Sequence, residues 1–407
     1  MSRQFHAEDR ALASEVERVW RANGIARSTI RAYRQWIRRF RRYCLVRSQI
    51  PEEQLRQQNV RRWMARYVRV RGKGPLRSPS LANSALWAWS WGLQVCGYAV
   101  PPWRDSLPPI PPLPPLQEAF RRHRREVQGV AESTARRDLK ILQEFLDFLR
   151  CRGRTTATIQ VTDIDRFLSK CSGRLVPKTL AGVASVLRSF LGFLHMTGQI
   201  RHDLTTVVAS PRVRRGDTPP RALPWSDVRR ILRAINKEIR SGLRDYALLL
   251  TMAAYGLGAG EVRRLMLESV DWRRRELHVV RPKTGRAIDL PLLPGVARAL
   301  AAYLRRGRPR HCTTRALFVQ MHAPYGQIDS ASAIRHMLHK HAATAGVSAT
   351  FLGSHVLRHS HACRQIDLGA SPTVVGDILG HRRPESTSAY VRVALRRLRG
   401  MALPVPT

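Results

Sequence analysis

The chain has 407 residues, of which 71 are lysine or arginine and 29 are aspartate or glutamate, so its formal net charge is +42. Such an excess is typical of a protein that binds a polyanion, DNA or RNA, although a general bias towards arginine could account for part of it. The six cysteines form no C-x-x-C pair, the N-terminus has no apolar leader, and the longest apolar run, about residues 247–257, is too short to cross a bilayer. Secreted disulfide-rich and membrane-spanning classes are therefore not expected.

Residues 1–100 are predicted to form a helical module. Apolar side chains recur at helical spacing from Ile30 to Cys44, which predicts one packed face. A parallel stripe of basic residues runs along the same helix: Arg31, Arg34, Arg38 and Arg41. Such a stripe is either a solvated face or a surface that lies along DNA, and the one-sided charge of the chain favours DNA.

Residues 101–115 hold eight prolines and predict an extended linker. Residues 116–209 then predict a second helical module that resembles the first. Ala26-Arg27-Ser28-Thr29-Ile30 recurs as Ala131-Glu132-Ser133-Thr134-Ala135, and Phe40 corresponds to Phe145 at the same offset. This pattern indicates an internal duplication, unless it reflects only the spacing that any two amphipathic helices share.

A basic linker, residues 210–224, precedes a third domain, residues 225–407. Strand-like runs in this domain are few: Glu276–Arg281, Ala287–Pro291 and Leu317–Gln320. Ser371 before Pro372 predicts a helix start, and Gly380 predicts a helix end. The expected fold class is therefore mainly α with a small antiparallel β-sheet, in which two N-terminal helical DNA-binding modules precede the third domain.

The most specific pattern lies near the C-terminus. His355-Val356-Leu357-Arg358 is followed by Leu379-Gly380-His381 and then by Tyr390. Breaking a phosphodiester without metal requires fixed cationic donors for the non-bridging oxygens and a nucleophile that can leave again. The planar fork of Arg358 suits two such oxygens, and His355 lies one turn earlier on the same helix face. The pattern therefore predicts DNA cleavage through a covalent phosphotyrosine at Tyr390.

These motifs resemble the catalytic domain of the tyrosine recombinases, the phage-integrase family, over roughly residues 221–400. In that family a His-x-x-Arg box opens a helix, a Leu-Gly-His turn follows about twenty residues later, and the nucleophilic Tyr comes nine residues after that His. The resemblance implies that His381 contacts the phosphate. Arg281-Pro282-Lys283-Thr284-Gly285 resembles the hairpin that delivers a catalytic Lys, which implies that Lys283 is the general acid.

The second module resembles the core-binding domain of the family, a four-helix clamp on the far side of the DNA duplex. By position on the helix after Pro177, Lys178 and Arg188 are its expected DNA contacts.

One position departs from the family pattern. The first catalytic Arg of a Gly-Leu-Arg-x-x-Glu stretch is replaced by Gly258, whereas Glu261, which supports the site in relatives, stays in register. Losing one charged donor typically costs about two to three decades in rate. Arg263 or Arg264 could fill the space, so the sequence leaves open whether activity is lost or compensated.

The leading hypothesis is a DNA strand transferase of a mobile element that works as a tetramer on double-stranded DNA, without metal or other cofactor. The alternative is a catalytically attenuated accessory subunit that binds DNA while other recombinases cut. A metal-dependent nuclease lacks a carboxylate cluster, and His336-x-x-His339-x-His341 does not complete a zinc set. We expect a cytoplasmic, nucleoid-associated bacterial protein.

Overall fold

The computed structural model describes residues 2–71, 79–104, 112–212, 221–281, 285–323, 325–349, 351–380 and 390. The chain divides into two compact units. Unit 1 combines Met1–Leu107 with Pro219–Thr407, and unit 2 spans Pro108–Thr218. Each unit buries apolar side chains of its own.

The N-terminal helices of unit 1 enclose a core rich in tryptophan. Their bounds are α1 Ser2–Ala22, α2 Arg27–Leu45, α3 Gln57–Arg71 and α4 Pro79–Val95. Trp20, Trp36 and Trp63 are each 3% exposed or less, and their rings meet neighbouring rings edge to face. Large rings in this geometry stabilise a small core beyond the area that they bury. Tyr325, from the C-terminal part of unit 1, belongs to the same core, with its ring centroid 4.9 Å from that of Trp91.

Unit 2 is a second set of helices with a core of its own. Its elements are α5 Pro115–Glu126, α6 Glu132–Arg150, a 3-10 turn at Thr156–Thr158, α7 Val161–Ser172 and α8 Pro177–Met196. By length and composition α8 could cross a membrane, but its apolar side chains fill the core of this unit, as expected for a central helix.

Helices α2 and α6 correspond in length and in the positions of most of their buried residues. Each has 19 residues and starts after an alanine in extended conformation, Ala26 or Ala131. Phe40 and Phe145, which are equivalent by register, are both almost fully buried. The two helices therefore use one packing pattern, whereas a duplication as its origin stays a prediction.

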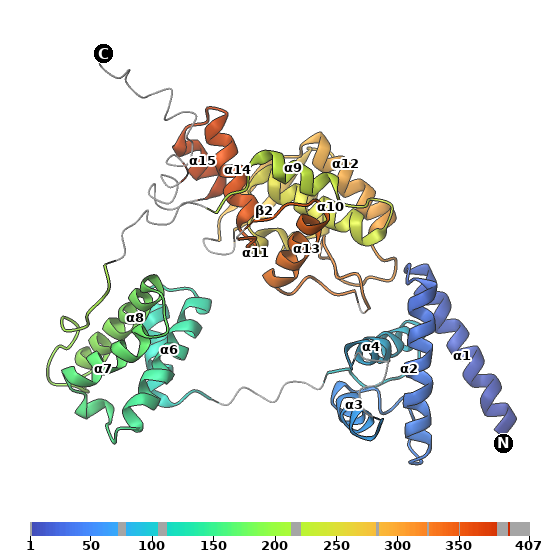
Figure 1. The fold of residues 1–407 in the computed structure, drawn as a ribbon, viewed down its shortest axis with the longest axis horizontal. Coiled ribbons are helices and arrows are strands. Elements are labelled where there is room, and N and C mark those ends of the chain that lie inside the picture. The colour runs from blue at the N-terminus through green and yellow to red at the C-terminus, as the bar shows by residue number, and fades with distance from the viewer. Residues whose placement is uncertain are drawn as a thin grey trace. The chain divides into compact units, whose positions relative to one another are not determined.

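The C-terminal part of unit 1 is a helical assembly with one small sheet (Figure 1). Its helices are α9 Trp225–Arg233, α10 Arg240–Tyr255, α11 Ala259–Val262, a 3-10 turn at Leu267–Ser269, α12 Pro294–Ala302, a π-helical turn η3 at Tyr303–Gly307, α13 Ala331–Thr344, α14 Val356–Asp367 and α15 Pro372–Leu379. Helix α10 is apolar on most sides and packs against α9, α11, α12, η3 and α14. A helix of this kind belongs in the centre of a domain.

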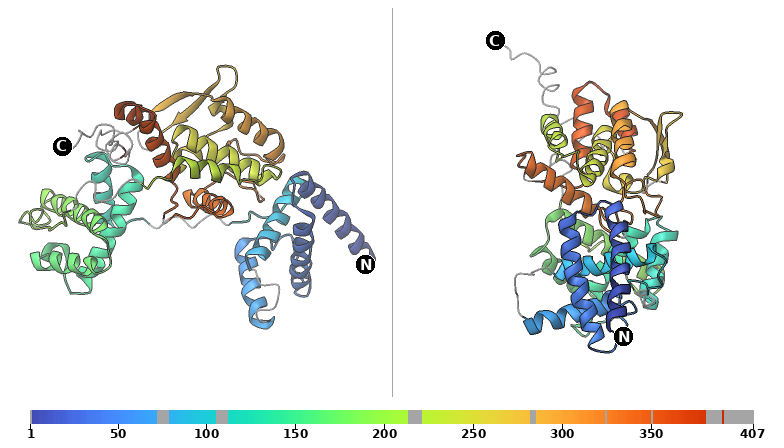
Figure 2. Two further views of the ribbon diagram at one scale, coloured as in Figure 1. Left: turned by 45° about the horizontal axis from the view of Figure 1, so that its top comes forward. Right: turned by 90° about the vertical axis from the view of Figure 1, so that its right-hand side faces the viewer.

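The sheet is antiparallel and has the order β1-β2-β3, with β1 at Val270–Asp271, β2 at Glu276–Val280 and β3 at Ala287–Pro291. The paired strands are visible in the left view of Figure 2. Leu277 pairs with Leu290 and both point into the core. The predicted strand at Leu317–Gln320 is wrong: among the described residues this run makes only an isolated bridge, between Val319 and Gln327.

The predicted fold class, mainly α with a small antiparallel sheet, is confirmed. Ser371 caps α15 by accepting a hydrogen bond from the Val374 amide, and Gly380 ends that helix with φ 66°. The segment expected to be a linker, residues 101–115, begins with a packed residue, since Trp103 is 7% exposed and its carbonyl accepts from the Gln57 amide.

Candidate active site and DNA-contact surfaces

Tyr390 lies against α14 and α15 in an apolar setting. Its side chain is 4% exposed and packs with Ile366, Val375 and Leu379. Its Oη is 2.9 Å from Nδ1 of His359, and the two ring centroids are 5.6 Å apart. The phenol thus has an imidazole within proton-transfer distance.

Burial governs the protonation of the phenol. It raises the pKa of Tyr390 above the ordinary value, and the nearby Arg358 guanidinium opposes this only in part. The phenol is therefore protonated at neutral pH, and an attack by its oxygen requires a group that accepts the proton.

Arg358 is anchored from three directions. Its Nη1 donates to the Gly256 carbonyl and to Glu261 Oε2, both at 3.0 Å, and its Nη2 donates to the Leu379 carbonyl. Burial lowers the pKa of Arg358, and Glu261 opposes that shift. An arginine remains charged in such a setting, so the site holds a fixed positive charge.

The turn between α10 and α11 brings Glu261 to this guanidinium. Gly256 ends α10 with φ 63°, and a Cβ there would come within 2.8 Å of His361 and Leu379 side-chain atoms. Only glycine fits such a close turn without strain. Glu261 Oε2 also accepts the Gly258 amide at 2.7 Å, which fixes the start of α11.

Gly258 lies at the edge of the same site. A Cβ at this position would meet Glu261 Oε2 and His355 Cε1, each at 3.4 Å, which is ordinary contact, and its φ of −75° suits any residue. Arg263 Nη1 donates to the Asp329 carbonyl, and Arg264 Nη1 donates to the Gly260 carbonyl. Each of these guanidiniums thus has a backbone carbonyl as a partner, and the partner of Arg264 lies within α11 itself.

A second buried guanidinium does reach Glu261. Arg281 is 6% exposed, and its Nη1 donates to Glu261 Oε1 at 2.9 Å and to the Leu379 carbonyl at 2.6 Å. Its Nη2 donates to the Ile378 carbonyl. One carboxylate therefore joins two arginines, Arg281 and Arg358.

His355 is the residue before α14, is exposed, and has its ring centroid 6.4 Å from that of His359. Tyr390, Arg358, Glu261 and His355 thus meet in one place. Lys283 and His381, which the sequence also assigned to the site, lie outside the described residues.

The histidine triplet on α13 has a different environment. His341 Nε2 lies 2.8 Å from Asp245 Oδ2, and Asp245 also binds Arg244. All three side chains are buried between α10 and α13, where they form a structural ion network. Within the part of the chain that the structure describes, no group of three His, Cys, Asp or Glu side chains is placed to hold a metal ion.

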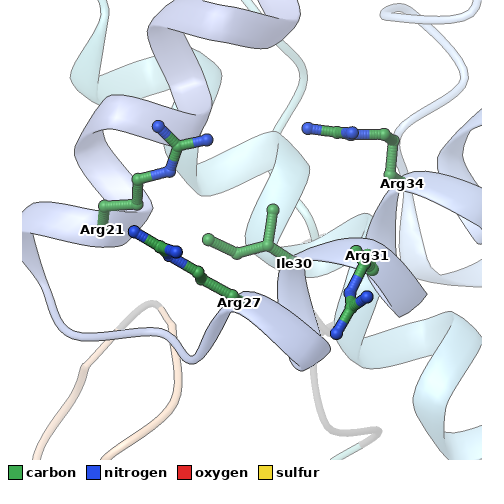
Figure 3. Close-up of a pocket in the computed structure, with 5 residues that line it drawn as sticks. All are labelled: Arg21, Arg27, Ile30, Arg31 and Arg34. Atoms are coloured by element: carbon green, nitrogen blue, oxygen red, sulfur yellow. The ribbon is translucent and has the colours of Figure 1, made fainter.

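The arginine stripe on α2 divides into paired and exposed members. Arg34 makes a bidentate ion pair with the buried Glu17, and Arg41 pairs with Glu52. Arg31 and Arg38 are exposed. A cavity of about 360 Å³ in this surface is lined by Ile30 and four arginines. Figure 3 shows their side chains near Ile30: Arg21, Arg27, Arg31 and Arg34. This surface suits an anion such as a phosphate.

The two predicted contacts on α8 also differ. Lys178 is exposed at the start of the helix. Arg188 is half-buried, and its Nη2 donates to the Val208 carbonyl at 3.0 Å, so it fastens the segment after α8 to the module. Part of its hydrogen-bonding capacity is therefore structural.

Comparison with known proteins decides the family. Residues 221–397 match the phage integrase family, and residues 118–198 match the phage integrase N-terminal SAM-like domain. The chain is 33% identical to the integrase/recombinase y4rA of Sinorhizobium fredii over 290 residues. These residues cover 71% of this chain and 70% of that protein. The chain belongs to the phage integrase family.

Other members resemble this integrase-family chain over similar lengths. Tyrosine recombinase XerC of Roseiflexus castenholzii is 30% identical over 285 residues, which are 68% of this chain and 88% of that protein. The lambda integrase dimer bound to a core site matches with a TM-score of 0.52 at 14% identity, over 72% of this chain and 98% of that one. XerH bound to its palindromic substrate matches with a TM-score of 0.54 at 15% identity, over 70% of this chain and 93% of that one. The structural likenesses show the common fold.

Two residues of the site were not found from the sequence. His359 directly follows the His-x-x-Arg box, and its adjacency to Arg358 was the available signal. Arg281 continues the inward alternation of Leu277 and Val279 along β2, so strand periodicity could have placed it inside.

Proposed function

We propose that this chain cuts and rejoins DNA at specific sites through a covalent 3′-phosphotyrosine, with Tyr390 as the nucleophile. The observation that carries the proposal is the meeting of a buried phenol, an imidazole 2.9 Å away and the anchored Arg358 guanidinium. An isolated buried tyrosine is ordinary packing. A tyrosine beside a proton acceptor and a fixed cation is equipped to attack a phosphodiester.

In the proposed step, Tyr390 Oη forms a bond to the scissile phosphorus while its proton passes to His359 Nδ1. The bond from phosphorus to the 5′ oxygen breaks, and that oxygen takes a proton from Lys283. Religation reverses both proton transfers, so the energy of the phosphodiester is conserved in the tyrosine ester.

Arg358 and His355 are proposed to hold the non-bridging oxygens, with His381 as a further donor. The planar guanidinium matches two oxygens at once and is already oriented by Glu261 and the Gly256 carbonyl, so little reorganisation is needed during reaction. Since these side chains supply the positive charge, the proposed chemistry requires no cofactor.

Double-stranded DNA is the proposed partner. The exposed Arg31, Arg38 and Lys178 are proposed phosphate contacts, and paired Arg34, Arg41 and Arg188 are proposed to shape the surfaces around them. A solved relative is a lambda integrase tetramer bound to a Holliday junction. We propose a homo- or hetero-tetramer on DNA that serves a mobile element, together with other recombinases of that element.

A nicked suicide substrate tests this function, because loss of the short strand after cleavage traps the covalent complex. The wild-type protein is expected to form an adduct that resists denaturation, and Tyr390→Phe is expected to form none while it binds DNA with nearly unchanged affinity. Tyr246→Phe, a partly buried tyrosine of the same domain, is the control. Adducts that persist with Tyr390→Phe would overturn the assignment.

Gly258 keeps a second candidate open, an accessory subunit that binds recombination sites without cutting. This candidate predicts specific DNA binding by the wild-type protein but no adduct on any strand. It also predicts that a mixture with an active recombinase of the same element gives adducts only on that partner.

A further inference from the structure

We infer that Arg281 supplies, from the end of β2, the second positive charge that the site lacks at position 258. Arg281 acts as a positioning residue, through Glu261 and Arg358, and the inference rests on the proposed function. Its basis is the shared carboxylate, the excess of buried positive charge and the direction of the strand.

The two guanidiniums share their acceptors. Glu261 gives one carboxylate oxygen to each, with Arg281 Nη1 at 2.9 Å from Oε1 and Arg358 Nη1 at 3.0 Å from Oε2. The Leu379 carbonyl accepts from both arginines. Arg281 therefore holds Glu261 in the orientation that aligns Arg358, and it stands beside Arg358 rather than in a separate network.

Among the residues that the structure describes, the charges of this cluster do not cancel, since two guanidiniums meet one carboxylate. Burial lowers the pKa of Arg358 most, and the like charge of Arg281 lowers it further. Arg281 is 6% exposed and Glu261 8%, so solvent screens the surplus weakly. A buried surplus of one positive charge matches one phosphodiester, which carries one negative charge.

The fold provides a definite place for this side chain. Alternation along β2 turns Leu277 and Val279 inward and Val280 outward, so the next residue, Arg281, points inward. Its guanidinium lies against Gly380, where an added Cβ would come within 2.5 Å of Nε. The turn that precedes His381 in the sequence is thus shaped around Arg281, while Arg263 and Arg264 donate to the Asp329 and Gly260 carbonyls.

The test compares two suicide substrates, one with the native scissile phosphate and one with a neutral methylphosphonate at that position. Total cleaved strand is measured for wild type and for Arg281→Met, which keeps most of the side-chain length and removes the charge. Because an electrostatic role needs a charged phosphate, Arg281→Met should lose about 10²- to 10³-fold on the native substrate and less than about 3-fold on the methylphosphonate. Arg230→Met, at an exposed arginine that pairs with Asp227 on α9, is the control and should lose nothing on either substrate.

Two further variants separate charge from folding. Arg281→Lys keeps the charge but not the fork and should lose less than Arg281→Met on the native phosphate. Gly258→Arg should restore most of the activity of Arg281→Met, because it returns a guanidinium to the edge of the site. Thermal unfolding and DNA affinity of each variant show whether the fold survives.

The outcomes separate the inference from the function on which it rests. Suppose that the wild-type protein forms adducts, but Arg281→Met loses cleavage equally on both substrates or on neither. That result overturns the role of Arg281 and leaves the proposed function standing. Failure of Gly258→Arg to restore a folded Arg281→Met protein also overturns it. No adduct from wild type overturns the proposed function, and the inference with it.

Discussion

The Oη atom of Tyr390 lies 2.9 Å from Nδ1 of His359, in a setting where the phenol is 4% exposed. Burial alone would make this tyrosine a weak nucleophile, since it raises the pKa of the phenol. In the proposed step the imidazole removes that obstacle, because it accepts the proton during attack. We therefore propose that His359 is the general base for Tyr390.

Replacing His359 by Gln should slow cleavage and change its dependence on pH. At neutral pH we expect a loss of about 10²- to 10⁴-fold, the usual contribution of a general base. The difference in rate between the variant and wild type should shrink as pH rises, because Tyr390 then ionises to the phenolate without a general base. The pKa of this phenol lies above the ordinary value of 10.0, so the effect belongs to the alkaline range. Single-turnover cleavage rates across the alkaline range measure this. A loss of the same size at every pH would show that His359 only packs against the ring.

Gly380→Ala should destabilise the protein more than Gly285→Ala. Both glycines have positive φ, 66° and 69°, so both substitutions carry backbone strain of about 1–2 kcal/mol. At Gly380 the new Cβ would also approach Arg281 Nε to 2.5 Å, whereas at Gly285 no atom of the described residues lies within 4 Å. We expect an additional cost of roughly 1–3 kcal/mol from this overlap. Denaturant unfolding of the two variants gives the comparison, and equal destabilisation would contradict the packing described here.

Arg31→Gln should weaken DNA binding in a salt-dependent way, and Arg41→Gln should do so much less. Arg31 is exposed beside the cavity on α2, whereas Arg41 is already paired with Glu52. Each lost phosphate contact should reduce the slope of log affinity against log salt by about 0.9. Binding titrations at several salt concentrations measure the slope. If Arg31→Gln leaves it unchanged, or if both variants change it alike, α2 makes no phosphate contact through Arg31.

Local periodicity was sufficient for much of the fold. The strand at Ala287–Pro291 was predicted with its observed bounds, and Glu276–Val280 within one residue, because alternation on both sides of a glycine-containing turn defines a hairpin. The run at 317–320 has similar composition but finds no strand partner within the described residues, only an isolated bridge. Composition alone cannot distinguish these cases, since strand formation depends on a distant partner.

The site shows a similar division. Spacing pointed to Arg358 and Tyr390, because residue types with distinct chemistry recur at fixed offsets. The residue type of Arg281 gave no signal, because the chain contains 71 lysines and arginines. Its proposed role depends on its ion pair with Glu261, which lies 20 positions earlier in the sequence. His359 was hidden in the same way, since its partner Tyr390 is 31 positions away and only folding brings them together.

The most direct test of the central claim identifies the residue that carries the DNA. After trapping on a suicide substrate, proteolysis and mass spectrometry of the adduct should locate the nucleotide on the peptide that contains Tyr390, joined through the 3′ phosphate. The wild-type chain, with Gly258 unchanged, should give this adduct. A nucleotide on another residue, a 5′ linkage, or specific DNA binding with no adduct at all would contradict the account.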